Sequence, residues 1–263
     1  FQEMRCKTST HHNLLESLGR IGKCVNDTDP NTIPVDGLDE VCFILCNTYE
    51  YRADWNLGVG PLNDAYMIAL SHHRRGFKIF FLYEPRKQEF IDYCKFFLQN
   101  TTKALTIFYS GRATAYCGSC GGKIVSNIGA IVFINQDTLI ADELSRILAR
   151  YSNGQSKIVL ITDCCNGNAP WNLIFAHKDN KNLTGKIVVF NVAKHGSTED
   201  WKRDEKIHGI FTFYFCKTID EFPSITPAEL IRKMNARLKR FDESIIYAQS
   251  SEAMKNTPIF ESY

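Results

Sequence analysis

The chain has 263 residues, of which 44% are hydrophobic and 23% charged, as is usual for a soluble globular protein with a sizeable core. Its formal net charge of +2 gives no reason to expect nucleic acid or an anionic membrane as a partner. No apolar stretch reaches the roughly 18 residues that a membrane-spanning helix needs, and no signal peptide opens the chain. Because the first residue is Phe1, we expect a processed chain or a piece of a longer one.

The cysteines indicate a reducing, cytoplasmic setting rather than a disulfide framework. The chain has ten of them. Several lie in or beside apolar runs, where cysteine behaves as a small hydrophobe; these are Cys42, Cys46, Cys164, Cys165 and Cys216.

Residues 1–38 are polar and predict an N-terminal extension. After them, apolar runs alternate with helical patterns. The apolar runs predict strands at 41–46, 77–83, 104–110, 129–134, 157–162 and 186–191. The helical patterns predict helices at 63–75, 87–99, 139–152 and 226–241. The composition of 209–219 favours a strand.

This order predicts one α/β domain over residues 39–263, with a mostly parallel sheet of about six strands covered by helices on both faces. In such a fold, functional residues gather at the carboxyl ends of the strands. Two pentapeptides stand at such ends: Tyr109-Ser110-Gly111-Arg112-Ala113 and Asp163-Cys164-Cys165-Asn166-Gly167.

Residues 39–263 resemble the caspase domain of metacaspases and their caspase relatives. Phe108-Tyr109-Ser110-Gly111 is similar to the family's Y-S-G-H-G motif, and Asp163-Cys164-Cys165 to its D-C-C-H-S-G motif. Shorter likenesses are Asn63-Asp64-Ala65, Gly129-Ala130-Ile131-Val132, Gly209-Ile210-Phe211-Thr212 and Thr257-Pro258. The third of these resembles the G-A-F-T that opens a family helix, which favours a helix at 209–219 against the local composition.

The resemblance assigns Cys165 to the position of the nucleophile and Arg112 to the position of the catalytic histidine. In caspases that histidine lies about 50 residues before the cysteine, and Arg112 lies 53 residues before Cys165. Metacaspases cut after arginine or lysine, using acidic residues in the specificity pocket. Asp163 keeps such a position, whereas Gly129 replaces an acidic residue, and Lys194, His195 and Gly196 interrupt another acidic stretch. We therefore expect the pocket to have lost most of its negative charge.

Arginine cannot replace the histidine as a base. A thiol peptidase needs a group that takes up and returns a proton near neutral pH. The guanidinium stays protonated below about pH 12 and has no acceptor atom. The leading hypothesis is therefore an inactive, caspase-like scaffold that binds proteins, either an active relative or a larger assembly. It implies no cofactor and no metal.

Two alternatives stay open at this point. An active cysteine endopeptidase would need another base, and the histidines available are His11, His12, His72, His73, His177, His195 and His208. Among them His195 is the best candidate, because it follows a predicted strand end. A metal or redox module would centre on Cys117 and Cys120, a C-x-x-C pair expected in a loop after Arg112. The doublet His72-His73 is interpreted as a cation pair at a helix C-terminus.

Overall fold

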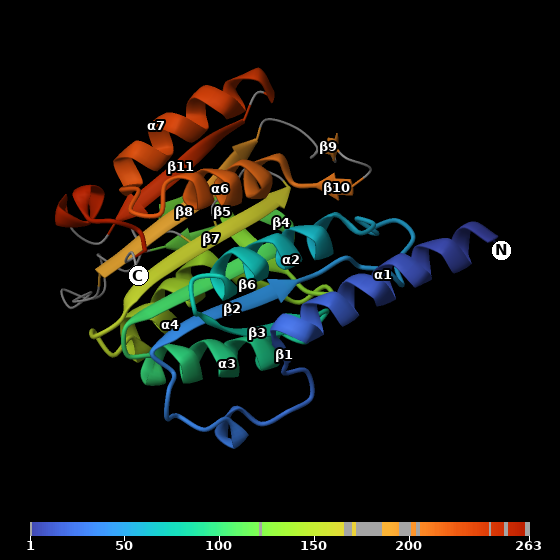
Figure 1. Cartoon of the computed structure of the whole chain (residues 1–263), viewed down its shortest axis with the longest axis horizontal. Coiled ribbons are helices and arrows are strands. Elements are labelled where there is room, and N and C mark those ends of the chain that lie inside the picture. The colour runs from blue at the N-terminus through green and yellow to red at the C-terminus, as the bar shows by residue number, and fades with distance from the viewer. Residues whose placement is uncertain are drawn as a thin grey trace.

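A mostly parallel sheet runs through the molecule (Figure 1). The structure is a computed structural model that describes residues 2–120, 123–165, 170–171, 186–194, 201–203, 206–241, 243–249 and 252–260. The helices are α1 (Gln2–Ile21), α2 (Gly60–His73), α3 (Lys87–Asn100), α4 (Ala141–Tyr151), α6 (Ile210–Glu221) and α7 (Pro227–Leu238), with short 3₁₀ turns η1 (Pro30–Thr32), η2 (Lys239–Phe241) and η3 (Glu252–Asn256). The strands are β1 (Lys23–Cys24), β2 (Glu40–Cys46), β3 (Lys78–Tyr83), β4 (Ala104–Cys120), β5 (Lys123–Val132), β6 (Thr138–Ile140), β7 (Lys157–Cys165), β8 (Lys186–Lys194), β9 (Trp201–Arg203), β10 (Lys206–His208) and β11 (Glu243–Gln249).

The strands of the main sheet lie in the order β1-β3-β2-β4-β7-β8-β11. Every neighbouring pair from β1 to β8 is parallel, and β11 closes the far edge antiparallel to β8. The second half of β4 leaves this sheet and forms an antiparallel hairpin with β5, to which β6 is added. This is the predicted α/β fold with a mostly parallel sheet.

Alternation of side chains along the strands divides the core between the two faces of the sheet. On β2, Cys42 and Ile44 belong to the core beneath α2, α6 and α7, while Phe43 and Leu45 belong to the core beneath α3 and α4. The two sets of helices lie on opposite sides of the strands in Figure 1. Because both faces are covered, the strands read as continuous apolar runs in the sequence.

Most predicted elements are confirmed, including the helix at 209–219, which is α6. The helix at 226–241 begins with the expected capping box, in which Thr226 and Glu229 exchange hydrogen bonds. Strand β11 is not among the predicted elements, because its apolar core is short and its partner β8 is distant in sequence.

Two further expectations need correction. The polar pattern of residues 1–38 predicts an extension, whereas α1 packs against α2, and β1 adds a strand beside β3. Cys117 and Cys120 do not follow Arg112 in a loop, because β4 continues through them and pairs with β5. The register of this hairpin shifts between Tyr116 and Gly118, as in a β-bulge.

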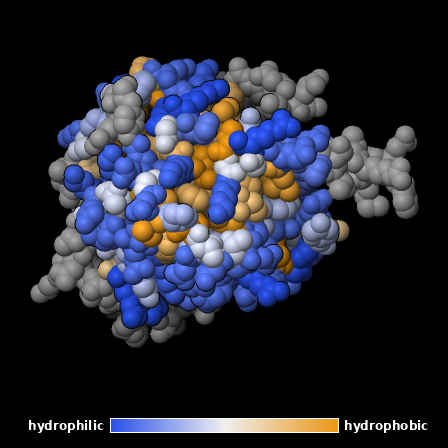
Figure 2. Space-filling view, turned by 60° about the horizontal axis from the view of Figure 1, so that its bottom comes forward, coloured by the Kyte–Doolittle hydropathy of each residue, from blue (hydrophilic) through white to orange (hydrophobic). Residues whose placement is uncertain are grey.

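On the face seen in Figure 2, hydrophobic residues gather in a central area bordered by hydrophilic ones. Within the described residues the exposed large hydrophobic side chains are Val35, Tyr51 and Phe222. None of the helices described is both long enough and apolar enough to cross a membrane.

Candidate functional site

The described residues of the two pentapeptides meet where the parallel pairing of β4 with β7 ends, at Arg112 within β4 and at Cys165, the last residue of β7. In the parallel register of these strands, Ser110 lies opposite Asp163, Gly111 opposite Cys164, and Arg112 opposite Cys165. Neighbouring strands are about 4.8 Å apart, and residues in register share a face of the sheet. Arg112 and Cys165, which the resemblance assigns to the histidine and nucleophile positions, are therefore side by side. The side chain of Cys165 lies outside the described part of the structure.

Arg112 is bound to the loop that connects β2 with α2. Its Nε donates a hydrogen bond to the carbonyl oxygen of Trp55 at 2.9 Å. Its backbone N–H donates to the hydroxyl of Tyr49 at 3.1 Å, and its own carbonyl accepts from the hydroxyl of Tyr109. The side chain and the backbone of Arg112 thus both hold the loop of residues 47–59 against the middle of β4.

Tyr49 is the centre of this arrangement. Its ring is buried, its backbone has a positive φ of 56°, and its hydroxyl donates to the carbonyl of Val132 at 2.6 Å. Burial raises the pKa of the Tyr49 hydroxyl to about 12, so the group stays protonated and can donate. The ring of Trp55 meets that of Tyr49 edge-on at 5.8 Å, and the Arg52 guanidinium lies 4.5 Å from the Trp55 ring centre. No local sequence pattern indicates this cluster.

Tyr49→Phe is expected to lower the free energy of unfolding by about 2 kcal/mol, because the N–H of Arg112 and the carbonyl of Val132 would lose a buried partner. Tyr51→Phe is the matched control, since Tyr51 is 88% exposed and its change should stay within about 0.5 kcal/mol. Chemical denaturation of both variants measures the difference. Equal stabilities would mean that the Tyr49 hydroxyl does not hold the loop.

Two buried carboxylates, those of Asp64 and Asp163, lie at the beginning of α6. Oδ2 of Asp163 accepts from the backbone N–H of Thr212 at 3.1 Å and from its hydroxyl at 2.6 Å. Oδ1 of Asp64, on α2, accepts from the N–H of Gly209 at 2.8 Å, and its Oδ2 accepts from the Ser110 hydroxyl at 3.2 Å. Negative groups at a helix N-terminus complement the unpaired N–H groups and the helix dipole. Asp64 and Asp163 therefore anchor α6 to the end of β7.

The two carboxylates bear on the expectation that the substrate pocket has lost most of its negative charge. Gly129 does lie close by: it is buried on β5 opposite Ala115, three residues beyond Arg112 on β4. Asp64 and Asp163 nevertheless keep two carboxylates at this end of the sheet, and both accept hydrogen bonds from α6 or the residue before it. Asp64 is a site residue that the sequence reasoning missed, although the Asn63-Asp64-Ala65 stretch pointed to it. His195 lies outside the described residues.

One described histidine, His72, lies away from Cys165. His72 is fully buried, with Nδ1 donating to the Ile68 carbonyl at 2.9 Å and Nε2 at 3.1 Å from the Thr106 hydroxyl. Thr106 precedes Arg112 by six residues on β4, a separation of about 20 Å along a strand. Burial lowers the pKa of His72 to about 4, so the interpretation of His72 as a cation is wrong. His11 is buried on α1, with Nδ1 4.0 Å from Oε1 of Glu50.

The side chains of Cys117 and Cys120 lie outside the described residues, so their chemistry stays a prediction. Across the described part of the chain, no group of three or more His, Cys, Asp or Glu side chains could hold a metal ion. Cys42, Cys46, Cys94 and Cys216 are buried thiols outside disulfides, and burial raises the pKa of each. They are core residues rather than nucleophiles.

Comparison with known proteins supports the fold. No protein-family model matches the chain, and no curated protein matches it. A crystal structure of the protein GSU0716 from Geobacter sulfurreducens is similar, with a TM-score of 0.54 and 12% sequence identity; the match covers 84% of this chain and 98% of that protein. At this identity the similarity shows a shared fold.

Proposed function

We propose that this chain is a caspase-like pseudoprotease that has kept the nucleophile position and lost the general base. The observation that carries the proposal is the register of β4 and β7, in which Arg112 lies directly opposite Cys165. A caspase-type dyad needs an imidazole there. The carboxyl ends of the central strands are also where an α/β sheet carries its active site.

The chemistry of the two positions argues against turnover. Peptide hydrolysis by a thiol requires a partner that accepts the thiol proton and then protonates the leaving amine. The Arg112 guanidinium can do neither near neutral pH. Loss of general acid–base catalysis costs a factor of about 10² to 10⁴, and loss of a complete nucleophile–base unit costs more.

The surroundings of the pair support the same conclusion. Nε of Arg112 is bound to the Trp55 carbonyl, so the side chain has a structural role in place of a catalytic one. The carboxylates of Asp64 and Asp163, which a basic substrate side chain would need, instead accept hydrogen bonds from Gly209 and Thr212 of the same chain. We propose that the domain serves as a binding or assembly scaffold in a reducing compartment, with an active relative or a larger protein assembly as partner.

Incubation of the purified protein with fluorogenic peptide libraries tests the proposal. Wild type and Cys165→Ala are expected to release fluorophore at the same background rate. Arg112→His is expected to stay within about tenfold of that background, because the new imidazole would lack the hydrogen bond to Trp55 and the carboxylates would still be engaged by α6.

Turnover by wild type that Cys165→Ala abolishes would overturn the proposal and favour an active endopeptidase. His195→Ala then identifies the base, since it would reduce such activity greatly. An exposed histidine, His73, supplies the matched control for that change.

A further inference from the structure

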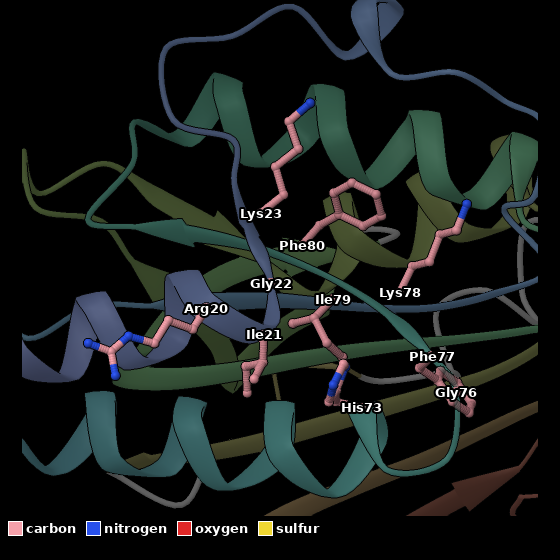
Figure 3. Close-up of a pocket in the computed structure, with 10 residues that line it drawn as sticks. All are labelled: Arg20, Ile21, Gly22, Lys23, His73, Gly76, Phe77, Lys78, Ile79 and Phe80. Carbon is pink, nitrogen blue, oxygen red and sulfur yellow. The ribbon is translucent and has the colours of Figure 1, made fainter.

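A basic groove lies at the edge of the sheet, between the ends of α1 and α2 and the beginning of β3 (Figure 3). Its volume is about 560 Å³. Because β3 begins here, the groove is at the amino ends of the strands, opposite the end that carries Arg112 and Cys165. The residues that line it are Arg20, Ile21, Gly22, Lys23, His73, Gly76, Phe77, Lys78, Ile79 and Phe80.

The groove lies where the edge strand of the sheet, β1, is only two residues long. Strand β1 pairs only with Phe80 and Phe81 of β3, and among the described strands none lies beyond it. Gly22, just before β1, lies so close to Ile79 that a Cβ atom would be 2.7 Å from its Cγ2. Because Gly22 has no side chain, Ile79 can pack directly against the backbone, and Ile79 and Phe77 form a buried apolar floor.

Positive charge is concentrated around this floor. Arg20, Lys23, His73 and Lys78 are exposed, and the lining contains no carboxylate. No ion pair between described residues uses any of the four. The formal net charge of the whole chain is only +2, so the concentration is local.

Helix dipoles explain only part of this charge. Arg20 and His73 lie in the last turns of α1 and α2, where a cation is favoured. Lys23 and Lys78 lie on strands, and the positive charge of Lys78 also helps to lower the pKa of the nearby Asp39. In Figure 3 these two lysines point to one side of β3, toward α3, while Arg20 and His73 lie on the other side. A chain crossing this edge would therefore meet Lys23 and Lys78 on one side and Arg20 on the other.

We propose that this groove binds an extended acidic peptide segment of a partner protein. Its carboxylates would lie against Lys23, Lys78 and Arg20. An extended segment fits because it can lie along a sheet edge, as in recognition by strand addition. The groove and the site are at opposite ends of the strands, so this proposal stands apart from the one on peptidase activity.

A short fluorescein-labelled peptide of alternating glutamate and valine is the probe, and fluorescence anisotropy is the readout. The double variant Lys23→Glu/Lys78→Glu is expected to weaken binding of this probe about tenfold or more, with a strong dependence on salt. Lys186→Glu is the matched control, because Lys186 is an exposed lysine at the beginning of β8, on the far side of the sheet. It should leave the dissociation constant unchanged within about twofold.

Equal binding of the probe by the double variant and by Lys186→Glu would overturn the proposal. So would equal binding of a peptide with glutamine in place of glutamate, or equally tight binding of a short single-stranded RNA at the same lysines. Self-association of wild type that the double variant abolishes would assign the groove to a second copy of the chain instead. Thermal denaturation checks that the variants are folded, and the milder Lys23→Gln/Lys78→Gln variant should show the same direction of change.

Discussion

Gly209→Ala is expected to lower the free energy of unfolding by about 4 kcal/mol, the largest effect of any substitution proposed for this chain. A Cβ atom at this position would be 2.1 Å from Oδ2 of Asp163 and 2.9 Å from Oδ2 of Asp64. The backbone φ of Gly209 is −65°, so the effect is steric rather than conformational. The Asp163 carboxylate cannot move aside without breaking its hydrogen bonds to Thr212.

Gly19→Ala is the control for this substitution. Gly19 lies on α1, and no atom is within 4 Å of the place that an added Cβ would occupy. Alanine there should leave stability unchanged or raise it by up to about 1 kcal/mol. Urea denaturation of both variants gives the two free energies. If Gly209→Ala lowers the free energy of unfolding by less than about 1 kcal/mol, the two carboxylates do not hold the beginning of α6 in place.

Acidification from pH 7 to pH 4 is expected to destabilise the protein by roughly 3 kcal/mol through His72 alone. Burial, helped by the nearby Arg75, lowers the pKa of His72 from its usual 6.5 to about 4, while the Ile68 carbonyl and Asp220 oppose the shift. Between these values the unfolded chain binds a proton that the folded chain does not, so stability falls as the pH falls. Above the unfolded pKa the contribution is fully present.

The measurement is the free energy of unfolding at several pH values for wild type and for His72→Gln. The variant should be less stable than wild type at pH 7, because the imidazole also packs between Phe77 and Phe260, yet it should lose less stability on acidification. His73→Gln, at the exposed neighbour, should keep the wild-type dependence. Parallel curves for wild type and His72→Gln would contradict the prediction.

The sequence was informative wherever local pattern determines structure. Buried parallel strands appear as continuous apolar runs, as in β2 and β7, and the capping box at Thr226 marks the beginning of α7. The composition of 209–219 favours a strand, yet the segment forms α6. The physical reason is tertiary, because hydrogen bonds from Gly209 and Thr212 to distant carboxylates fix the first turn of this helix.

Only part of the candidate site could be predicted from the sequence. The neighbouring positions of Arg112 and Cys165 follow from the order of the elements, because the parallel strands β4 and β7 are in register up to these two residues. That β4 continues beyond Arg112 to Cys120 was not predicted, because the continuation depends on its pairing with β5. The contacts of Arg112 with Tyr49 and Trp55 could not be predicted, because they depend on how the 47–59 loop folds back over β4. The hydrogen bonds from Gly209 and Thr212 to Asp64 and Asp163 could not be predicted either, because these residues belong to α2, β7 and the beginning of α6.

The anchoring of α6 by Asp163 has an evolutionary consequence. An aspartate that supports a helix remains under selection even when no substrate is cut, because its loss would unfold the first turn of α6. The same holds for its partners Gly209 and Thr212. Among chains of this fold, an intact Asp-Cys-Cys strand end therefore reports that this helix anchor is kept, and by itself it says nothing about peptide cleavage.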